Sequence, residues 1–297
     1  MVHLVRRRNG VAPFERFLAS YREHPAGIPH DLVLIFKGFP FGRGTEAYDR
    51  LLADVPHRRL YLADYGFDMR PYFKAVERFD YRFFCFLNSY SRILDVDWLA
   101  KLHRWVTKEG VGLVGATGSY ESFSSNYAER SNMLAGLGIS ERLRWRLEHL
   151  LSGSGPGAIV HYAAGWIAES LRLKDPRQFF PAFPNFHIRT NAFMAARKTL
   201  LQVRPGPMLF KFSAYALESG QNSLTSQVMR HGLKPLVIAR TGESFEKEQW
   251  HLSDTFRQAL QQDLLVADSQ TDAYHALDAT QRAVLSRQTW REFARPA

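Results

Sequence analysis

The stretch Tyr81-Arg82-Phe83-Phe84-Cys85-Phe86-Leu87-Asn88-Ser89-Tyr90-Ser91 begins as a run of large apolar residues and ends in small or polar ones. A short apolar run bounded by polar residues is typical of a buried strand in a parallel sheet. In an open α/β sheet, ligands bind just beyond the carboxyl ends of the strands. Asn88–Ser91 therefore lies where a binding site would be, but on this stretch alone a core strand followed by an ordinary loop is the favoured interpretation.

Shorter apolar segments on both sides of this stretch alternate with helical patterns. Further strands are predicted at Val2–Val5, Asp31–Phe36, Arg59–Ala63 and Val111–Val114, and helices at Pro13–Glu23, 45–52, Pro71–Phe79 and Asp95–Trp105. Such alternation predicts parallel strands joined by crossover helices. The predicted fold class is α/β, with a Rossmann-like, mostly parallel sheet flanked by helices.

The chain changes character after residue 118. Residues 119–185 are predicted to form a helical insertion, 186–245 to return to the sheet, and 246–297 to form a helical C-terminal segment. In the insertion, the basic and amphipathic segment Glu141–Leu147 predicts either a solvated surface helix or contact with an anionic membrane surface. Beyond residue 118 we expect helices near Asn126–Leu137, Glu141–Leu151, Ala158–Leu173, Asn222–His231, Thr255–Leu265 and Ala279–Phe293, strands at His187–Ala196 and Leu236–Ala239, and a loop or helix start at 214–220.

The composition narrows the class of protein. A chain of 297 residues suffices for one large α/β domain or two small ones. The single cysteine, Cys85, excludes a disulfide framework, and neither a signal peptide nor a membrane span is recognisable, so we expect a cytoplasmic protein. The formal net charge of +10 predicts an anionic partner, but the charge is spread along the chain and no nucleic-acid recognition motif accompanies it.

Several familiar catalytic motifs are missing from the sequence. It contains no G-x-x-x-x-G-K-[ST] phosphate loop, no C-x-x-C or H-E-x-x-H metal signature and no G-x-S-x-G nucleophile elbow. The first strand is followed by Arg6–Gly10 in place of a G-x-G-x-x-G turn, which argues against a Rossmann dehydrogenase. The glycine-rich run Gly153–Gly157 does not follow a predicted strand, and we interpret it as a linker.

The order of these signals resembles the GT-A glycosyltransferases, especially family 2-like bacterial enzymes, over Val2 to Arg240. The matching elements are Asp64-Tyr65-Gly66-Phe67-Asp68, Phe86-Leu87-Asn88-Ser89-Tyr90, Thr190-Asn191-Ala192-Phe193-Met194 with Arg197, and Glu218-Ser219-Gly220-Gln221-Asn222-Ser223-Leu224-Thr225 followed by Gly232 and Leu236-Val237-Ile238. The resemblance implies that a sugar moves from a nucleotide-diphosphate sugar to a glycan or lipid-linked acceptor. Residues 1–118 would then bind the donor, and residues 186–245 would border the acceptor.

The resemblance implies that the donor lies along the carboxyl ends of the first four strands. Arginine and lysine side chains suit phosphate oxygens, and aspartates there either hold the nucleoside or make an ordinary turn. The residues assigned to the donor are Arg7, Arg8, Asn9, Lys37, Asp64, Gly66, Asp68, Arg70, Asn88 and Ser89. Plain surface charge is the alternative for the four basic residues of this set.

The two metal-binding aspartates of the family are replaced here by Asn88 and Tyr90. Asparagine is a weaker ligand than aspartate for a hard cation, and tyrosine is an unusual one. The sequence therefore leaves open whether Mg²⁺ or Mn²⁺ takes part, because basic side chains can neutralise the diphosphate instead.

Glu218 is the predicted catalytic base, since a carboxylate within hydrogen-bond reach can remove the proton of the acceptor hydroxyl. The alternative is that Glu218 only favours the N-terminus of the helix expected from Asn222. Thr190, Asn191, His187 and His251 are assigned to the acceptor side, and a structural role is the alternative for both histidines.

The leading hypothesis is a cytoplasmic glycosyltransferase of cell-surface polysaccharide synthesis, with a peripheral contact to the inner face of the membrane. The second hypothesis is a non-catalytic protein that binds a nucleotide sugar or carbohydrate on the same scaffold, which Asn88 and Tyr90 favour. The third, a nucleic-acid binder, is supported only by the net charge of +10, and we expect no nucleic-acid partner.

Overall fold

The structure is a computed structural model that describes residues 1–65, 69–135, 176–206, 208 and 211–295. The predicted helices Glu141–Leu151 and Ala158–Leu173, the linker Gly153–Gly157 and the assigned donor residues Gly66 and Asp68 lie outside the described residues.

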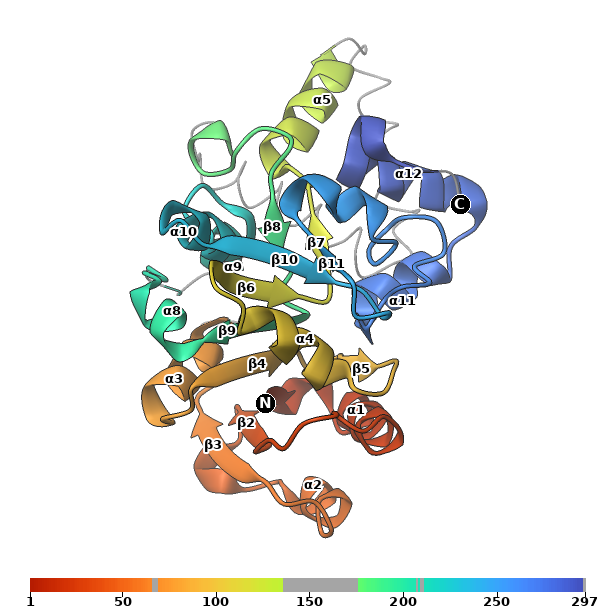
Figure 1. The fold of residues 1–297 in the computed structure, drawn as a ribbon. Helices are drawn as coiled ribbons and strands as arrows, with labels where there is room; N and C mark the ends of the chain where they lie inside the picture. The colour runs from red at the N-terminus through yellow and green to blue at the C-terminus, as the bar shows by residue number, and fades with distance from the viewer. Residues whose placement is uncertain (66–68, 136–175, 207, 209–210, 296–297) are drawn as a thin grey trace.

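Among the described residues, eight strands form one sheet in the order β11-β10-β6-β9-β4-β1-β2-β3 (Figure 1). The strands β1, β2, β3 and β4 are parallel to one another, as are β6 and β10. The sheet therefore confirms the predicted α/β class with mostly parallel pairing. The strands are β1 (Val2–Arg6), β2 (Val33–Lys37), β3 (Arg58–Leu62), β4 (Phe83–Leu87), β6 (Val111–Gly115), β9 (Ala192–Ala196), β10 (Lys234–Ile238) and β11 (Ser244–Phe245).

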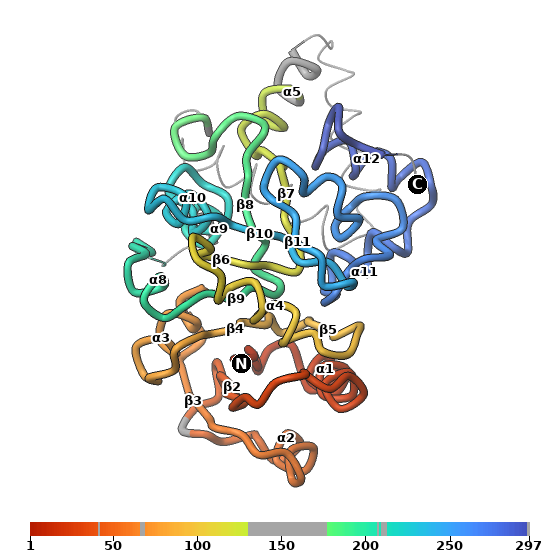
Figure 2. Tube along the Cα trace, in the orientation of Figure 1, coloured from red at the N-terminus to blue at the C-terminus, as the bar shows by residue number. Residues whose placement is uncertain are grey.

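Strand β9 lies between β4 and β6 and runs antiparallel to both (Figure 2). The edge strand β11 is antiparallel to β10. Two short ladders lie outside the main sheet, one between β5 (Arg92–Ile93) and β12 (Val266–Ala267), the other between β7 (Gly118–Ser119) and β8 (His187–Ile188). The predicted strand His187–Ala196 is thus two strands separated by a loop, and that loop reaches the carboxyl edge of the parallel strands.

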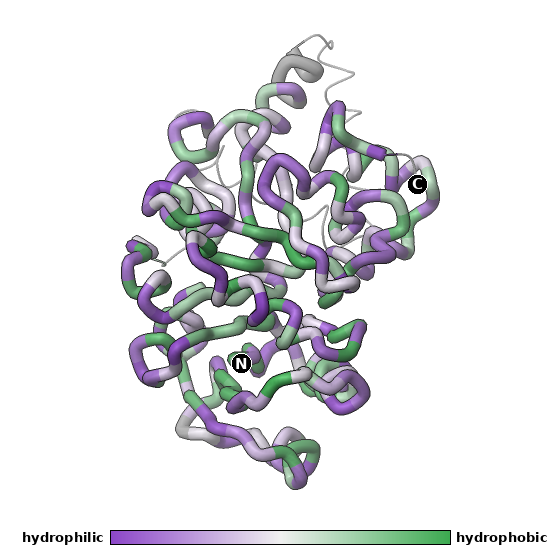
Figure 3. The backbone as a smooth tube through the Cα atoms, viewed as in Figure 1, coloured by the Kyte–Doolittle hydropathy of each residue, from purple (hydrophilic) through white to green (hydrophobic). Residues whose placement is uncertain are grey.

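Helices cover both faces of the sheet. The helices are α1 (Ala12–Glu23), α2 (Glu46–Leu51), α3 (Met69–Arg78), α4 (Trp98–Val106), α5 (Phe123–Ala135), α8 (Arg197–Gln202), α9 (Lys211–Ser219), α10 (Leu224–Arg230), α11 (Ser269–His275) and α12 (Ala279–Trp290). Buried residues of α1, α2 and α4 form one apolar cluster with the sheet, and those of α3, α8 and α10 form another on the opposite face. Figure 3 shows the hydrophobic colour along β6 and β10.

Strand β4 explains why the apolar run predicted the core so well. Its side chains alternate between the two faces, because successive residues of a strand point to opposite sides. Cys85 and Leu87 belong to the cluster with α1 and α4, whereas Phe84 and Phe86 belong to the cluster with α3. Both faces of β4 are therefore buried, and a continuous apolar run is the pattern that such a strand requires.

Two predicted helix boundaries are wrong. Residues 211–219 form α9, so 214–220 is neither a loop nor a helix start. The next helix begins after Ser223, whose hydroxyl accepts a hydrogen bond from the Ser226 N–H, and Asn222 is not its N-cap.

The predicted helix Thr255–Leu265 is also wrong, because the segment forms turns. Asp254, Arg257, Ala259 and Gln261 all adopt positive φ, which an α-helix excludes. The Asp254 carboxylate accepts from the backbone N–H groups of Gln261 and Gln262. Side-chain oxygens here take the place of the carbonyls that a helix would use.

Within the described residues, no helix combines the length and the apolar character needed to cross a membrane.

Candidate functional site

The candidate site is the edge of the sheet at which β1, β2, β4 and β6 end. Because β9 is antiparallel, the loop before it arrives at this same edge. The Asn88 N–H donates to the Asn191 carbonyl at 3.1 Å, and the Arg189 N–H donates to the Thr117 carbonyl at 3.1 Å. Three segments that are far apart in the sequence, 88–91, 116–117 and 189–191, are thus joined by backbone hydrogen bonds.

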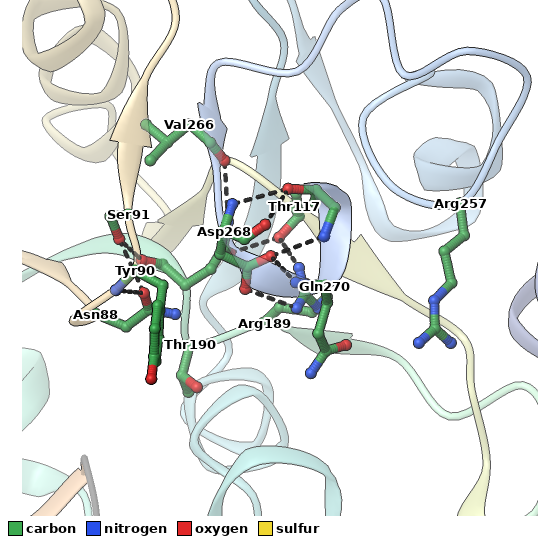
Figure 4. A network of polar contacts seen from close by, with 12 residues as sticks. Asn88, Tyr90, Ser91, Thr117, Arg189, Thr190, Arg257, Val266, Asp268 and Gln270 are labelled. Atoms are coloured by element: carbon green, nitrogen blue, oxygen red, sulfur yellow. Dashed lines mark hydrogen bonds and ion pairs between the residues drawn. The ribbon is translucent and has the colours of Figure 1, made fainter. Parts of the chain in front are cut away.

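The side chain of Asn191 holds these segments together through Thr117 and Val266, which are labelled in Figure 4. Its side-chain Oδ1 accepts from the Thr117 hydroxyl at 2.6 Å, and its Nδ2 donates to the Val266 carbonyl at 3.1 Å. The residue is 1% exposed. The structure brings Asn191 to the predicted edge, where its side-chain amide links the segment that follows β6 to strand β12.

Asn88 makes a tight turn at the end of β4. Its Oδ1 accepts from the Tyr90 N–H at 2.9 Å and lies 3.2 Å from the Ser91 hydroxyl, which is 2.9 Å from the Asn191 carbonyl. Such side-chain-to-backbone bonds are characteristic of asparagine in turns. Ser89 is buried within this turn, and the Tyr90 side chain is exposed.

Asn88 and Tyr90 would offer a divalent cation one amide oxygen and one phenol, and no carboxylate. The Asn88 oxygen already accepts a backbone hydrogen bond. In the part of the chain that the structure describes, no three His, Cys, Asp or Glu side chains are grouped as metal ligands would be.

Basic residues and one carboxylate meet at the ends of β1, β2 and β3. Arg6 Nε donates to Asp64 Oδ1 at 2.8 Å, and the ammonium of Lys37 lies 3.7 Å from the same oxygen. The side chain of Lys37 is fully buried, and that of Arg6 is 10% exposed. Two of the assigned donor residues, Lys37 and Asp64, are therefore brought together, and the partner that sequence reasoning missed is Arg6, the last residue of β1.

Among the described donor residues, Arg7, Arg8, Asn9 and Arg70 are more exposed than Lys37. Arg7, Arg8 and Asn9 form a short 3₁₀ helix directly after β1, and both arginines are exposed there. The guanidinium of Arg70, in the first turn of α3, lies 3.9 Å from the centre of the Tyr65 ring. Exposed cations at this edge leave room for an anionic ligand to approach.

Glu218 lies at the same edge, in the last turn of α9. Its Oε1 accepts from the Thr190 N–H at 3.0 Å, and the described residues offer Oε2 no hydrogen-bond partner. The hydrogen bond of Glu218 runs to the loop before β9, whereas the first turn of the next helix, α10, is capped by Ser223. The side chain of Glu218 is therefore held by that loop.

His187 lies close to Glu218 but inside the protein. Its Nδ1 is 2.8 Å from the Asn185 carbonyl, and burial lowers the pKa of the imidazole while Glu218 counteracts this. His251, in the 3₁₀ helix Lys247–Leu252, contacts Tyr120 and Phe293. Burial, with the charge of Arg295, also lowers the pKa of His251. Both histidines thus have structural contacts, the alternative considered for them.

Sequence reasoning missed two buried ion pairs beside the site. Arg189 pairs with Asp268 at 3.0 Å, and Arg257 pairs with Glu121 at 3.1 Å. Both arginines are at most 7% exposed in their side chains. The sequence showed the strand His187–Ala196 and the charged residues of the C-terminal segment. It gave no sign that an arginine of the first would pair with a carboxylate of the second.

This edge of the sheet therefore combines the carboxylate of Glu218, the polar turn at Asn88 and basic side chains at the ends of β1 and β2. Comparison of the chain with protein-family models and with curated proteins finds no match.

Proposed function

We propose that the protein is a glycosyltransferase, which moves a sugar from a nucleotide-sugar donor to a glycan or lipid-linked acceptor. The observation that carries this proposal is the hydrogen bond between Glu218 and the Thr190 N–H. It holds a carboxylate beside Asn191, whose carbonyl accepts from the Asn88 N–H at the end of β4. Ligands of open α/β sheets bind at this edge.

The two sides of the edge have complementary chemistry. The cations Arg7, Arg8 and Arg70 would bind the nucleotide diphosphate, because guanidinium groups neutralise phosphate oxygens. Asp64, held by Arg6 and Lys37, would contact the base or ribose, and Asn9, Asn88 and Ser89 would lie beside the diphosphate or donor sugar. Glu218 would take the proton of the attacking hydroxyl as the sugar leaves the diphosphate. Thr190 orients that carboxylate through its backbone N–H.

The second candidate function is non-catalytic binding of a nucleotide sugar. It is favoured by the Asn88 turn, in which an amide oxygen already in use replaces a metal-binding carboxylate. The proposed setting is the same for both candidates: the cytoplasm, at the inner face of the membrane, in the synthesis of a cell-surface polysaccharide.

Donor hydrolysis separates the two candidates. A thermal-shift screen over uridine, guanosine, thymidine and cytidine nucleotide sugars should identify the nucleotide that stabilises the protein. Hydrolysis of that donor should slow about 10²–10⁴-fold in Glu218→Gln, because general-base catalysis contributes roughly that factor. Glu109→Gln is the matched control, since Glu109 is exposed just before β6, at the opposite edge of the sheet. A donor that binds without measurable hydrolysis would support the non-catalytic candidate.

A further inference from the structure

A buried ion pair links the C-terminal segment to the loop that holds Glu218, the proposed base. Asp268 lies directly after β12, and its Oδ2 is 3.0 Å from a guanidinium nitrogen of Arg189, with side-chain exposures of 4% and 6% (Figure 4). Arg189 immediately precedes Thr190, the residue whose N–H holds Glu218. The chain of contacts from the C-terminal segment to the carboxylate therefore contains one ion pair, one peptide unit and one hydrogen bond.

Arg189 is fixed from several directions. Its guanidinium lies 3.9 Å from the centre of the Phe256 ring, and its backbone N–H donates to the Thr117 carbonyl at 3.1 Å. A guanidinium that is paired, stacked and buried has little freedom to change its rotamer. The position of the peptide unit between Arg189 and Thr190 is set accordingly.

Asp268 is fixed equally well. Its Oδ1 accepts from the N–H groups of Gln270 and Thr271, which caps the N-terminus of α11. Its own N–H donates to the Thr271 hydroxyl at 2.7 Å. One oxygen of the carboxylate thus anchors a helix while the other holds Arg189.

We infer that Arg189 and Asp268 are positioning residues for the reaction, which act through Thr190 on the carboxylate of Glu218. The inference rests on the proposed function for the role of Glu218, but the contacts themselves do not depend on it. A displacement of about 1 Å in a reacting group can cost about a hundredfold in rate. A base whose position is set by residue 268 would make the C-terminal segment part of the catalytic machinery.

The variant Asp268→Asn tests this inference, because asparagine caps α11 as well as aspartate does but removes the charge that faces Arg189. Hydrogen–deuterium exchange of the peptide that contains residues 187–191 should become faster. Hydrolysis of the donor found by the thermal-shift screen should show a kcat at least about tenfold lower with its KM unchanged within about twofold, since the nucleotide side is untouched. The control is Asp272→Asn on the same helix, which removes only an exposed pair with Arg92.

A double variant keeps the test decisive if Asp268→Asn alone does not fold. Arg189→Met with Asp268→Asn removes both charges, and such replacements of a buried pair are often neutral for stability. A folded variant, single or double, with wild-type exchange at 187–191 and wild-type kcat would overturn the inference, and so would unfolding of both variants. Loss of activity in Glu218→Gln alone would leave the proposed function standing without the inference. If the wild-type protein hydrolyses no donor, the proposed function fails, and the exchange measurement alone decides whether Asp268 positions Thr190.

Discussion

The guanidinium of Arg6 and the carboxylate of Asp64 meet at 2.8 Å and so join the carboxyl end of β1 to the turn after β3. Strand β2 lies between these two strands, and its last residue, Lys37, brings a buried ammonium to 3.7 Å from the same oxygen. One carboxylate therefore serves two buried cations at the ends of three adjacent strands.

We expect Asp64→Asn to lower the free energy of unfolding by about 1–3 kcal/mol, because it withdraws a negative charge from two buried cations without changing the shape of the side chain. Urea unfolding measures this directly. The control is Asp54→Asn, which removes a surface pair with Arg22 and should change stability by less than about 0.5 kcal/mol. Equal losses in the two variants would show that the buried cations do not depend on Asp64.

Nucleotide binding should be only weakly dependent on a divalent metal, since the Asn88 oxygen is already held by the Tyr90 N–H. Calorimetry in EDTA and in Mn²⁺ measures the difference. A loss of affinity greater than about a hundredfold, or roughly 2.7 kcal/mol, on removing the metal would contradict this. Asn88→Asp provides the comparison: one oxygen of its carboxylate can accept the same hydrogen bond while the other is available to a cation, so metal dependence should increase.

Acid should destabilise the protein through His3. The imidazole is fully buried, stacks on Phe17 at 3.7 Å and has no hydrogen-bond partner among the described residues, and burial lowers its pKa to about 3. The unfolded chain takes up a proton below its ordinary pKa of 6.5, whereas the folded chain stays neutral. Stability should therefore fall as the pH drops below about 6.5, by up to about 1.4 kcal/mol per pH unit.

Replacing His3 by leucine should remove that part of the pH dependence. Between pH 7 and pH 5, urea unfolding of His3→Leu should lose about 2 kcal/mol less than the wild type. The buried His187, whose pKa burial also lowers, should leave a residual slope in the variant. Identical slopes in the two proteins would show that His3 is not the group responsible.

Two substitutions of Glu218 distinguish its proposed role as the base from its role in holding the loop before β9. Glutamine keeps an oxygen that can accept from the Thr190 N–H, whereas alanine removes it and should cost about 1–2 kcal/mol of stability. If Glu218 is the base, both variants should lose turnover to a similar extent. Near-normal donor hydrolysis in Glu218→Gln, with loss only in Glu218→Ala, would mean that the carboxylate merely holds the loop.

The sequence predicted the strands and turns that depend on a local pattern of residue types. The apolar run of β4 and its polar end located both a central strand and the turn at Asn88, because a strand buried on both faces leaves few choices of residue type. The direction of β9 was not predictable, since an apolar run reads the same for parallel and antiparallel pairing. The ion pair between Arg189 and Asp268, 79 positions apart, was missed for a similar reason, because either residue alone is an ordinary surface charge.

The position of β9 in the sheet also determines when the sheet can become stable during synthesis of the chain. Within the described sheet, β9 is the strand that connects β6, β10 and β11 to β4, and it comes from residues 192–196. Until residues 192–196 have been synthesised, β4 keeps one unpaired edge and β6 lacks both of its neighbours in the sheet, because β10 (Lys234–Ile238) is synthesised later still. Unpaired strand edges are the kind of surface on which chains aggregate. We therefore expect the two halves of the sheet to become stable together, late in synthesis, and not one after the other.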